Sequence, residues 1–168
     1  MPAGGRRLRF TTNHDETAWD QPPVTLFGGP SGARAAFVAM ALLPGVPMLY
    51  NGQEVESPQK LGLFVKEPVA WGQANAAEAR AFYRRIIDLA RSDSAFTQGG
   101  LQIVRTDAEH DVIAYQRGDV LVIVNTRPTP TRINLADRHV AGMRDLITRA
   151  TLPTNTVALG PYGFAILR

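Results

Sequence analysis

The sequence LRFTTNHDE at residues 8–16 and the sequence PGVPMLYNGQE at residues 44–54 each run from apolar to polar side chains. Between them, residues 33–43 read ARAAFVAMALL, which is apolar on nearly every side of a helix and therefore predicts a buried helix. Leu8, Phe10 and their neighbours predict a short first strand before this helix. A proline and a glycine end the helix, and the apolar run 46–50 predicts a second short strand. The order strand, helix, strand is typical of parallel β/α units.

The segments around this unit extend it by one more helix. Residues 21–32 form a loop rich in proline and glycine, and Ser31 is a suitable N-cap for the buried helix. A longer loop covers residues 55–73. The clearest helical pattern follows at residues 76–91, where an apolar stripe consists of Ala79, Phe82, Tyr83, Ile86 and Ala90. Charged side chains occupy the other faces of this helix, and we expect them to face solvent.

After Gly99 and Gly100 the apolar period changes to two, which predicts strands. Gly118 and Asp119 separate two alternating runs and are typical of a hairpin. Short strands with regularly spaced turns indicate a small antiparallel sandwich. The seven predicted strands cover residues 101–104, 112–116, 120–125, 131–135, 144–148, 155–159 and 163–167.

The first half of the chain is incomplete as a folding unit. Two parallel strands cannot cover their own edges, nor can they bury a helix that is apolar all round. We therefore expect either additional chain or a partner to complete it.

Composition excludes several classes of protein. The chain has 168 residues with 18 Lys+Arg against 15 Asp+Glu, a net charge of +3, and no cysteine, which excludes disulfides, thiolate metal sites and thiol nucleophiles. The pI of about 9.7 comes from scattered arginines without interleaved aromatics, so we expect no nucleic-acid partner. We expect no membrane segment either, because the longest apolar stretch, residues 35–50, is broken by prolines. The cellular location stays open.

The polar cluster at residues 13–16 is the most informative for chemistry. A His next to an Asp at a strand end can serve acid-base catalysis, metal binding or recognition of hydroxyl groups. Taken alone, Asn-His-Asp is more often a turn in which side chains bond to the local backbone. The second motif, at the end of the second strand, makes the pattern more specific.

Together, FTTNHD and PGVPMLYNGQE resemble the alpha-amylase family, glycoside hydrolase family 13, at the ends of its barrel strands seven and eight. Residues 82–87 resemble the last barrel helix, and the closing LGPYGFAILR resembles the final strand of the C-terminal sandwich. The resemblance implies a fold of class α/β plus all-β: an incomplete (β/α)8 barrel fragment of two β/α units, followed by an antiparallel β-sandwich. The implied domains are residues 1–95 and residues 96–168.

The resemblance also implies roles for residues of the first motif. Asp15 matches the family's transition-state-stabilising carboxylate, His14 matches a histidine that binds the same sugar, and Asn13 completes the motif and shapes its loop. The family's nucleophilic Asp and acid Glu come from strands four and five, and Glu16 and Glu54 lack the context to replace them. We therefore expect no hydrolysis from this polypeptide alone. We expect no cofactor or metal in this chain, and a calcium ion, where present, in the missing part.

The implied partners are an alpha-glucan or oligosaccharide substrate, and either the missing barrel portion or a second copy of the chain. One alternative is a non-catalytic carbohydrate-binding or scaffold module in which the sandwich is the working part. A second alternative, suggested only by the pI, is a polyanion-binding protein, which a heparin column would reveal.

Other aromatic and histidine residues have simpler interpretations. Trp19, Phe64 and Trp71 could stack on sugar rings, although loop aromatics more often pack onto the scaffold. Tyr115 is a sheet residue that we expect to keep one end in water. The remaining histidines, His110 and His139, lack partners at metal-binding spacing.

Overall fold

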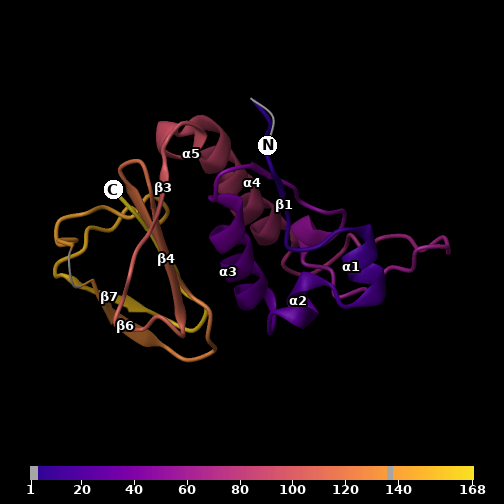
Figure 1. The fold of residues 1–168 in the computed structure, drawn as a ribbon. Helices are drawn as coiled ribbons and strands as arrows, with labels where there is room; N and C mark the ends of the chain where they lie inside the picture. Colours follow the sequence, from indigo (N-terminus) through magenta and orange to yellow (C-terminus); the bar gives the residue numbers. More distant parts are fainter. Residues whose placement is uncertain (1–3, 136–137) are drawn as a thin grey trace.

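The computed structural model describes residues 4–135 and 138–168 and places a helical part beside an antiparallel β part (Figure 1). The helical part contains β1 (Leu8–Arg9), α1 (His14–Trp19), α2 (Pro23–Leu26), α3 (Pro30–Ala41), β2 (Val46–Pro47), the 3-10 helix η1 (Gln53–Val55), α4 (Ala76–Ser92) and α5 (Ser94–Thr97). The β part contains β3 (Leu101–Ile103), β4 (Val112–Arg117), β5 (Val120–Asn125), β6 (Thr131–Asn134), β7 (Thr156–Leu159) and β8 (Phe164–Leu167). No helix within these described ranges combines the length and apolar character needed to cross a membrane.

The strand–helix–strand unit predicted from the sequence is present. Strands β1 and β2 pair in parallel, with Leu8 opposite Val46, and α3 connects them. The second strand is shorter than the predicted 46–50. Pro47 has no N–H to donate, and the pairing ends once the Met48 N–H has donated to the Arg9 carbonyl at 2.7 Å.

Helix α3 is buried as predicted, but its N-terminus differs from the prediction. The N-cap is Gly29 rather than Ser31, because Pro30 occupies the first helical position, where its fixed φ is favourable. Gly29 has a φ of 101°, which a residue with a side chain rarely adopts. The helix side chains packed in the core are Ala33, Ala35, Phe37, Val38 and Ala41.

Helix α4 agrees with the prediction to within one residue at its C-terminus. Of its apolar stripe, Ala79, Tyr83 and Ile86 are fully buried. Three shorter helices were not predicted: α1 begins within the polar cluster that was expected to be a turn, α2 starts directly at two prolines, and Asp93 caps α5 by accepting a hydrogen bond from the Ala95 N–H at 2.9 Å. They have six, four and four residues, too few for a helical apolar period to show.

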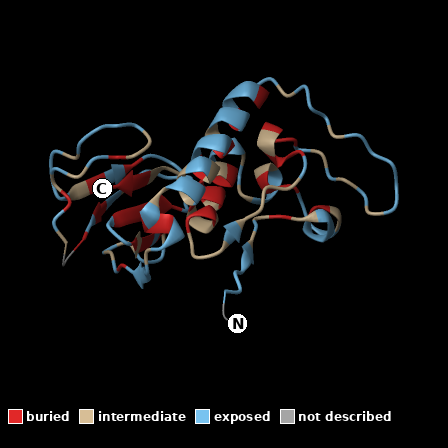
Figure 2. Ribbon diagram, turned by 90° about the horizontal axis from the view of Figure 1, so that it is seen from above, coloured by how far each residue is buried: buried red, intermediate tan, exposed pale blue. Residues whose placement is uncertain are grey.

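The β part consists of a four-stranded sheet in the order β3-β4-β5-β8 and a two-stranded sheet of β6 and β7, all antiparallel. The hairpin predicted at Gly118 joins β4 to β5. Every residue of β5 is buried, because this inner strand has a core on each of its faces, whereas every residue of the edge strand β3 is exposed. Figure 2 shows buried residues in both the helical part and the β part.

The two faces of the four-stranded sheet belong to two separate cores. Val120, Val122 and Val124 pack with α3 and α4, whereas Leu121 and Ile123 pack with β6 and β7. The helical part and the β part thus share one core across residues 95–96. The division of the chain into domains at that point stays a prediction.

The predicted strand at residues 144–148 is wrong. This segment makes only isolated bridges, because Asp145 organises a turn there. The Asp145 Oδ1 accepts hydrogen bonds from the N–H groups of Ile147 (2.8 Å) and Thr148 (2.6 Å), and its Oδ2 accepts from the Ile166 N–H at 3.0 Å. A carboxylate that bonds to its own following backbone favours a turn over a strand ladder.

Two side chains of β4 connect the sheet to the end of α3. Tyr115 is 1% exposed, and its hydroxyl donates to the Ala39 carbonyl at 3.0 Å, so the prediction that one end stays in water is wrong. Burial raises the pKa of the Tyr115 hydroxyl. Arg117 is also buried and donates to the Leu42 carbonyl at 2.7 Å and to the Phe96 carbonyl at 2.6 Å.

Candidate active site at the ends of the parallel strands

The first motif turns directly from β1 into helix α1. Asn13 is the N-cap, and its Oδ1 accepts hydrogen bonds from the N–H groups of Asp15 and Glu16, both at 2.9 Å. This arrangement is the local side-chain-to-backbone bonding expected of Asn in such a sequence. Asn13 therefore fixes how the two residues after it are presented.

His14 and Asp15 lie together in the first turn of α1. The His14 Nε2 is 3.5 Å from the Asp15 Oδ1, and the two side chains are 67% and 59% exposed. The structure brings both predicted site residues to the carboxyl end of β1, where active sites of parallel α/β folds are built. Their roles in binding and catalysis stay predictions.

Hydrogen bonds join the first motif to the second. The Gln53 Nε2 donates to the Thr11 Oγ1 at 2.8 Å, and the Thr12 and Thr17 hydroxyls lie 2.7 Å apart in a buried pair. Glu54 has a local role, because its Oε2 accepts a hydrogen bond from the Gly52 N–H at 2.9 Å. The polar ends of the two strands are thus one connected unit.

A buried ionic network behind this unit was missed by sequence reasoning. The Glu56 side chain is fully buried and accepts from the Arg34 Nε at 2.5 Å and Nη2 at 3.1 Å, and also from Asn75. Arg34 reaches Glu78 on α4 as well, at 2.5 Å. The bond to Glu56 raises the pKa of the Arg34 guanidinium, which therefore stays charged. Arg34 is the one charged residue in an otherwise apolar helix, a sequence signal that could have indicated a buried carboxylate partner.

The Glu56 carboxylate, through its bonds to Arg34 and Asn75, holds the loop after β2 against α3 and α4. Beside the network, Tyr83 is 1% exposed, and its hydroxyl has no hydrogen-bond partner within the described part of the chain. Burial raises the pKa of this hydroxyl, so it stays protonated at neutral pH.

The cavity enclosed by the two motifs is too small for a sugar, and the larger groove of about 940 Å³ that reaches Phe10 and Thr11 is lined by neither His14 nor Asp15. The cavity lined by Thr12, Thr17, Tyr50 and Gln53 measures about 20 Å³, which is room for one water molecule. The side chains of Asp15 and His14 lie outside it. A binding site here needs walls that these residues do not provide.

The aromatic side chains of the loops are exposed rather than packed. Trp19 is 76% exposed, Phe64 94% and Trp71 46%. Stacking on sugar rings is therefore sterically possible for them and stays a prediction. Across residues 4–135 and 138–168, no group of three or more His, Asp and Glu side chains is placed to hold a metal ion.

Solved structures of alpha-amylase-type enzymes share this fold. A maltogenic alpha-amylase from Thermotoga neapolitana superposes with a TM-score of 0.75 at 21% identity, covering 99% of this chain and 41% of that chain. The cyclic alpha-maltosyl-(1→6)-maltose hydrolase from Arthrobacter globiformis gives 0.68 at 26% identity, covering 99% and 36%. The trehalose-6-phosphate hydrolase from Bacillus licheniformis gives 0.72 at 18% identity, covering 98% and 43%. No protein-family model and no curated protein matches the chain.

The chain therefore has the fold of a C-terminal region of alpha-amylase family glycosidases, as the two sequence motifs predicted. It spans less than half the length of the solved structures that it matches.

Proposed function

We propose that the chain forms the C-terminal part of a retaining alpha-amylase-type glycoside hydrolase that acts on alpha-glucans, with Asp15 as its transition-state-stabilising carboxylate. The observation that supports this proposal most directly is the meeting of the two motifs at the carboxyl ends of β1 and β2. There the bond from Gln53 to Thr11 joins them, and the cap at Asn13 directs His14 and Asp15 outward from the same edge.

Retaining hydrolysis assigns separate tasks to separate carboxyl groups. A nucleophilic carboxylate and a carboxylic acid stand about 5 Å apart across the scissile bond. In this proposal both come from outside the 168 residues. Asp15 holds hydroxyl groups of the sugar at the cleavage point, and its charge favours the positively charged, oxocarbenium-like transition state over the ground state. His14 donates a hydrogen bond to the same sugar, and Asn13 keeps both residues in place.

Apolar residues near the site are exposed, as expected if the rest of a barrel covers them in the proposed enzyme. Leu8 is 56% exposed and Val46 44%, although both are apolar residues of the central strand pair. An apolar groove of about 940 Å³ also opens between α3 and the edge of the four-stranded sheet, where Ile103 and Ile113 are partly exposed. Apolar surface of this extent marks an interface. In this proposal the rest of a barrel covers it, and a second copy of the chain is the substitute when that part is absent.

The carbohydrate-binding alternative has less support. The β part carries two grooves, of about 940 Å³ beside α3 and about 430 Å³ beside β7, but the first is mainly apolar and neither is lined by His14 or Asp15. We therefore assign the substrate contact to the strand ends.

The test is a chimaera in which this chain replaces the matching region of the Thermotoga neapolitana maltogenic alpha-amylase. Asp15→Asn in that chimaera should lower kcat on maltooligosaccharides by about 10²–10³ or more, because it removes a charge that acts in the transition state. Its melting temperature should not change, because the side chain is exposed.

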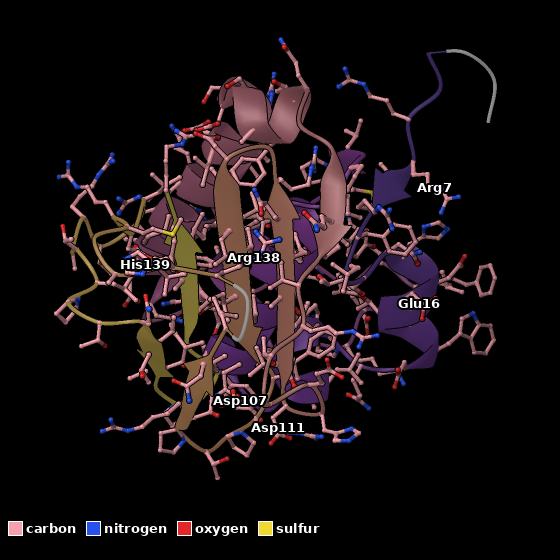
Figure 3. The ribbon with its side chains drawn as sticks, turned by 60° about the vertical axis from the view of Figure 1, so that its left-hand side comes forward. Arg7, Glu16, Asp107, Asp111, Arg138 and His139 are labelled. Carbon is pink, nitrogen blue, oxygen red and sulfur yellow. The ribbon has the colours of Figure 1, made fainter. Side chains whose placement is uncertain are left out.

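Glu16→Gln is the matched control. It removes one carboxylate from the same helical turn, and Glu16 projects from α1 at the edge of the molecule (Figure 3). It should leave kcat within about twofold. A chimaera that keeps near-normal kcat with Asp15→Asn, or a chain that hydrolyses maltooligosaccharides alone, would overturn the proposal.

A further inference from the structure

A second concave site lies at the opposite ends of β1 and β2 from the motif residues. It is a pocket of about 420 Å³ between the segment leading into β1, the turn before β2 and the end of α5. Four of its lining residues are arginines, Arg6, Arg7, Arg9 and Arg117, and none is acidic. A pocket of this volume falls in the range of small-molecule sites.

Arg117, the innermost of these arginines, is a buried cation that has no anionic partner among residues 4–135 and 138–168. Arg117 is 2% exposed, and its guanidinium donates only to carbonyl groups, those of Leu42, Phe96 and Gly99, at 2.6 to 3.2 Å. Loss of solvation lowers the pKa of this group. A buried charge that lacks an opposite charge is unfavourable, so a negative charge placed in the adjoining pocket would stabilise the fold.

The arginines in and before β1 can contact a ligand in the pocket. Arg6 and Arg7 are exposed and form no ion pair within the described part of the chain. Arg9 uses its Nε to donate to the Pro44 carbonyl at 3.1 Å, which directs the guanidinium along the pocket wall. Figure 3 shows Arg7 at the start of β1, apart from Glu16 on α1.

We propose that this pocket binds the phosphate group of a small phosphorylated molecule. A guanidinium presents paired N–H donors that match phosphate oxygens, and a phosphate group with about two negative charges can accept bonds from several arginines at once, whereas a carboxylate has only two oxygens. The volume leaves room beyond one phosphate group, for a second phosphate or a sugar. The site depends on neither Asp15 nor the hydrolase proposal.

The test is calorimetric titration of the 168-residue chain at constant ionic strength, with chloride as the background anion. The probes are inorganic phosphate, inorganic pyrophosphate and glucose 6-phosphate, with glucose as the uncharged comparison. We expect all three phosphates to bind and to raise the melting temperature, and glucose to do neither. Tighter binding of pyrophosphate than of glucose 6-phosphate would identify a polyphosphate ligand, and the reverse order a sugar phosphate.

Paired variants locate the binding. Arg6→Gln with Arg7→Gln should weaken phosphate binding by about tenfold or more. Arg84→Gln with Arg91→Gln removes the same charge from exposed positions on α4, and this control should change the affinity by less than about twofold. Asp15→Asn should have no effect, which separates this site from the hydrolase proposal. The inference is wrong if no phosphate binds at millimolar concentration, or if the control pair weakens binding as much as the first pair.

Discussion

Two valines show how differently the two parts of the molecule are packed. Val122, in the middle of β5, is completely buried, whereas Val46 in β2 is 44% exposed. Both belong to strands with a helix nearby, yet only the four-stranded sheet has a layer on each face. Because an apolar strand needs partners on both faces of a parallel α/β sheet, we expect the exposed valine to be covered by further chain in the proposed enzyme.

The helical part is stabilised by its packing against the β part. Helices α3 and α4 pack their apolar faces against the sheet of the β part, with Phe37 and Tyr83 in edge-to-face contact at 4.9 Å between ring centroids. Strands β1 and β2 have only two residues each and cannot cover these helices. The sheet of the β part covers them instead. The core of the helical part is therefore continuous with that of the β part.

The largest effect should come from breaking that contact at Arg117. Arg117→Ala removes the donor from the Leu42 and Phe96 carbonyls, which lie at the ends of α3 and α5, and leaves them buried without a partner. We expect the free energy of unfolding to fall by about 3 kcal/mol. Urea denaturation measures this loss. The control is Arg84→Ala, at an exposed position on α4, which should change the free energy of unfolding by no more than about 0.5 kcal/mol. A similar loss of stability in both variants would refute the role of Arg117.

The two valines themselves provide the next test. Val122→Ala should cost about 2 kcal/mol, because two buried methyl groups are lost and a cavity remains, whereas Val46→Ala should cost less than about 0.5 kcal/mol. Urea denaturation again measures both. In the chimaera described above, where a barrel covers β2, the cost of Val46→Ala should rise toward that of Val122→Ala. Equal costs in the isolated chain would show that β2 is already covered.

The smallest effect concerns pH and the ion pair that joins the two parts at α5. Asp93 accepts a hydrogen bond from Arg168 at 2.7 Å, and this bond lowers the pKa of the Asp93 carboxyl. A lowered folded-state pKa stabilises the fold above the unfolded pKa of about 3.9, and that stability is lost as the pH falls below this value and through the folded-state pKa. Asp93→Asn keeps an N-cap residue but removes the charge, so it should cost about 0.5–1 kcal/mol at pH 7 and less at about pH 2.

Asp119→Asn is the control for that measurement, since Asp119 also contacts Arg168, at 2.8 Å, but is 65% exposed. Because this pair is exposed to solvent, Asp119→Asn should cost less than Asp93→Asn at pH 7. A cost for Asp93→Asn that is the same at both pH values would mean that packing, and not charge, is responsible.

The sequence predicted the elements whose patterns are long enough to show a period. Helices α3 and α4 and the hairpin at Gly118 are of this kind. At the polar cluster the sequence predicted the side-chain-to-backbone bonding of Asn13 but not the helix α1 that this bonding caps. The turn at Asp145 was mistaken for a strand, because its apolar neighbours alternate while its carboxylate bonds to the backbone. The pair of Arg34 and Glu56 was missed because it joins residues 22 positions apart, one of them in a loop without periodicity. The lone charge of Arg34 in an apolar helix indicates that a partner is needed, but no local pattern indicates that the partner is Glu56.

The position of β8 in the sheet has a consequence for how the molecule is made. Ile166 packs against the helices and Leu167 packs with β6 and β7, so this one strand belongs to both cores. On the ribosome, α3 and α4 are made well before β8, and their apolar faces stay uncovered until that strand follows. Neither core can therefore be completed until β8 has been synthesised.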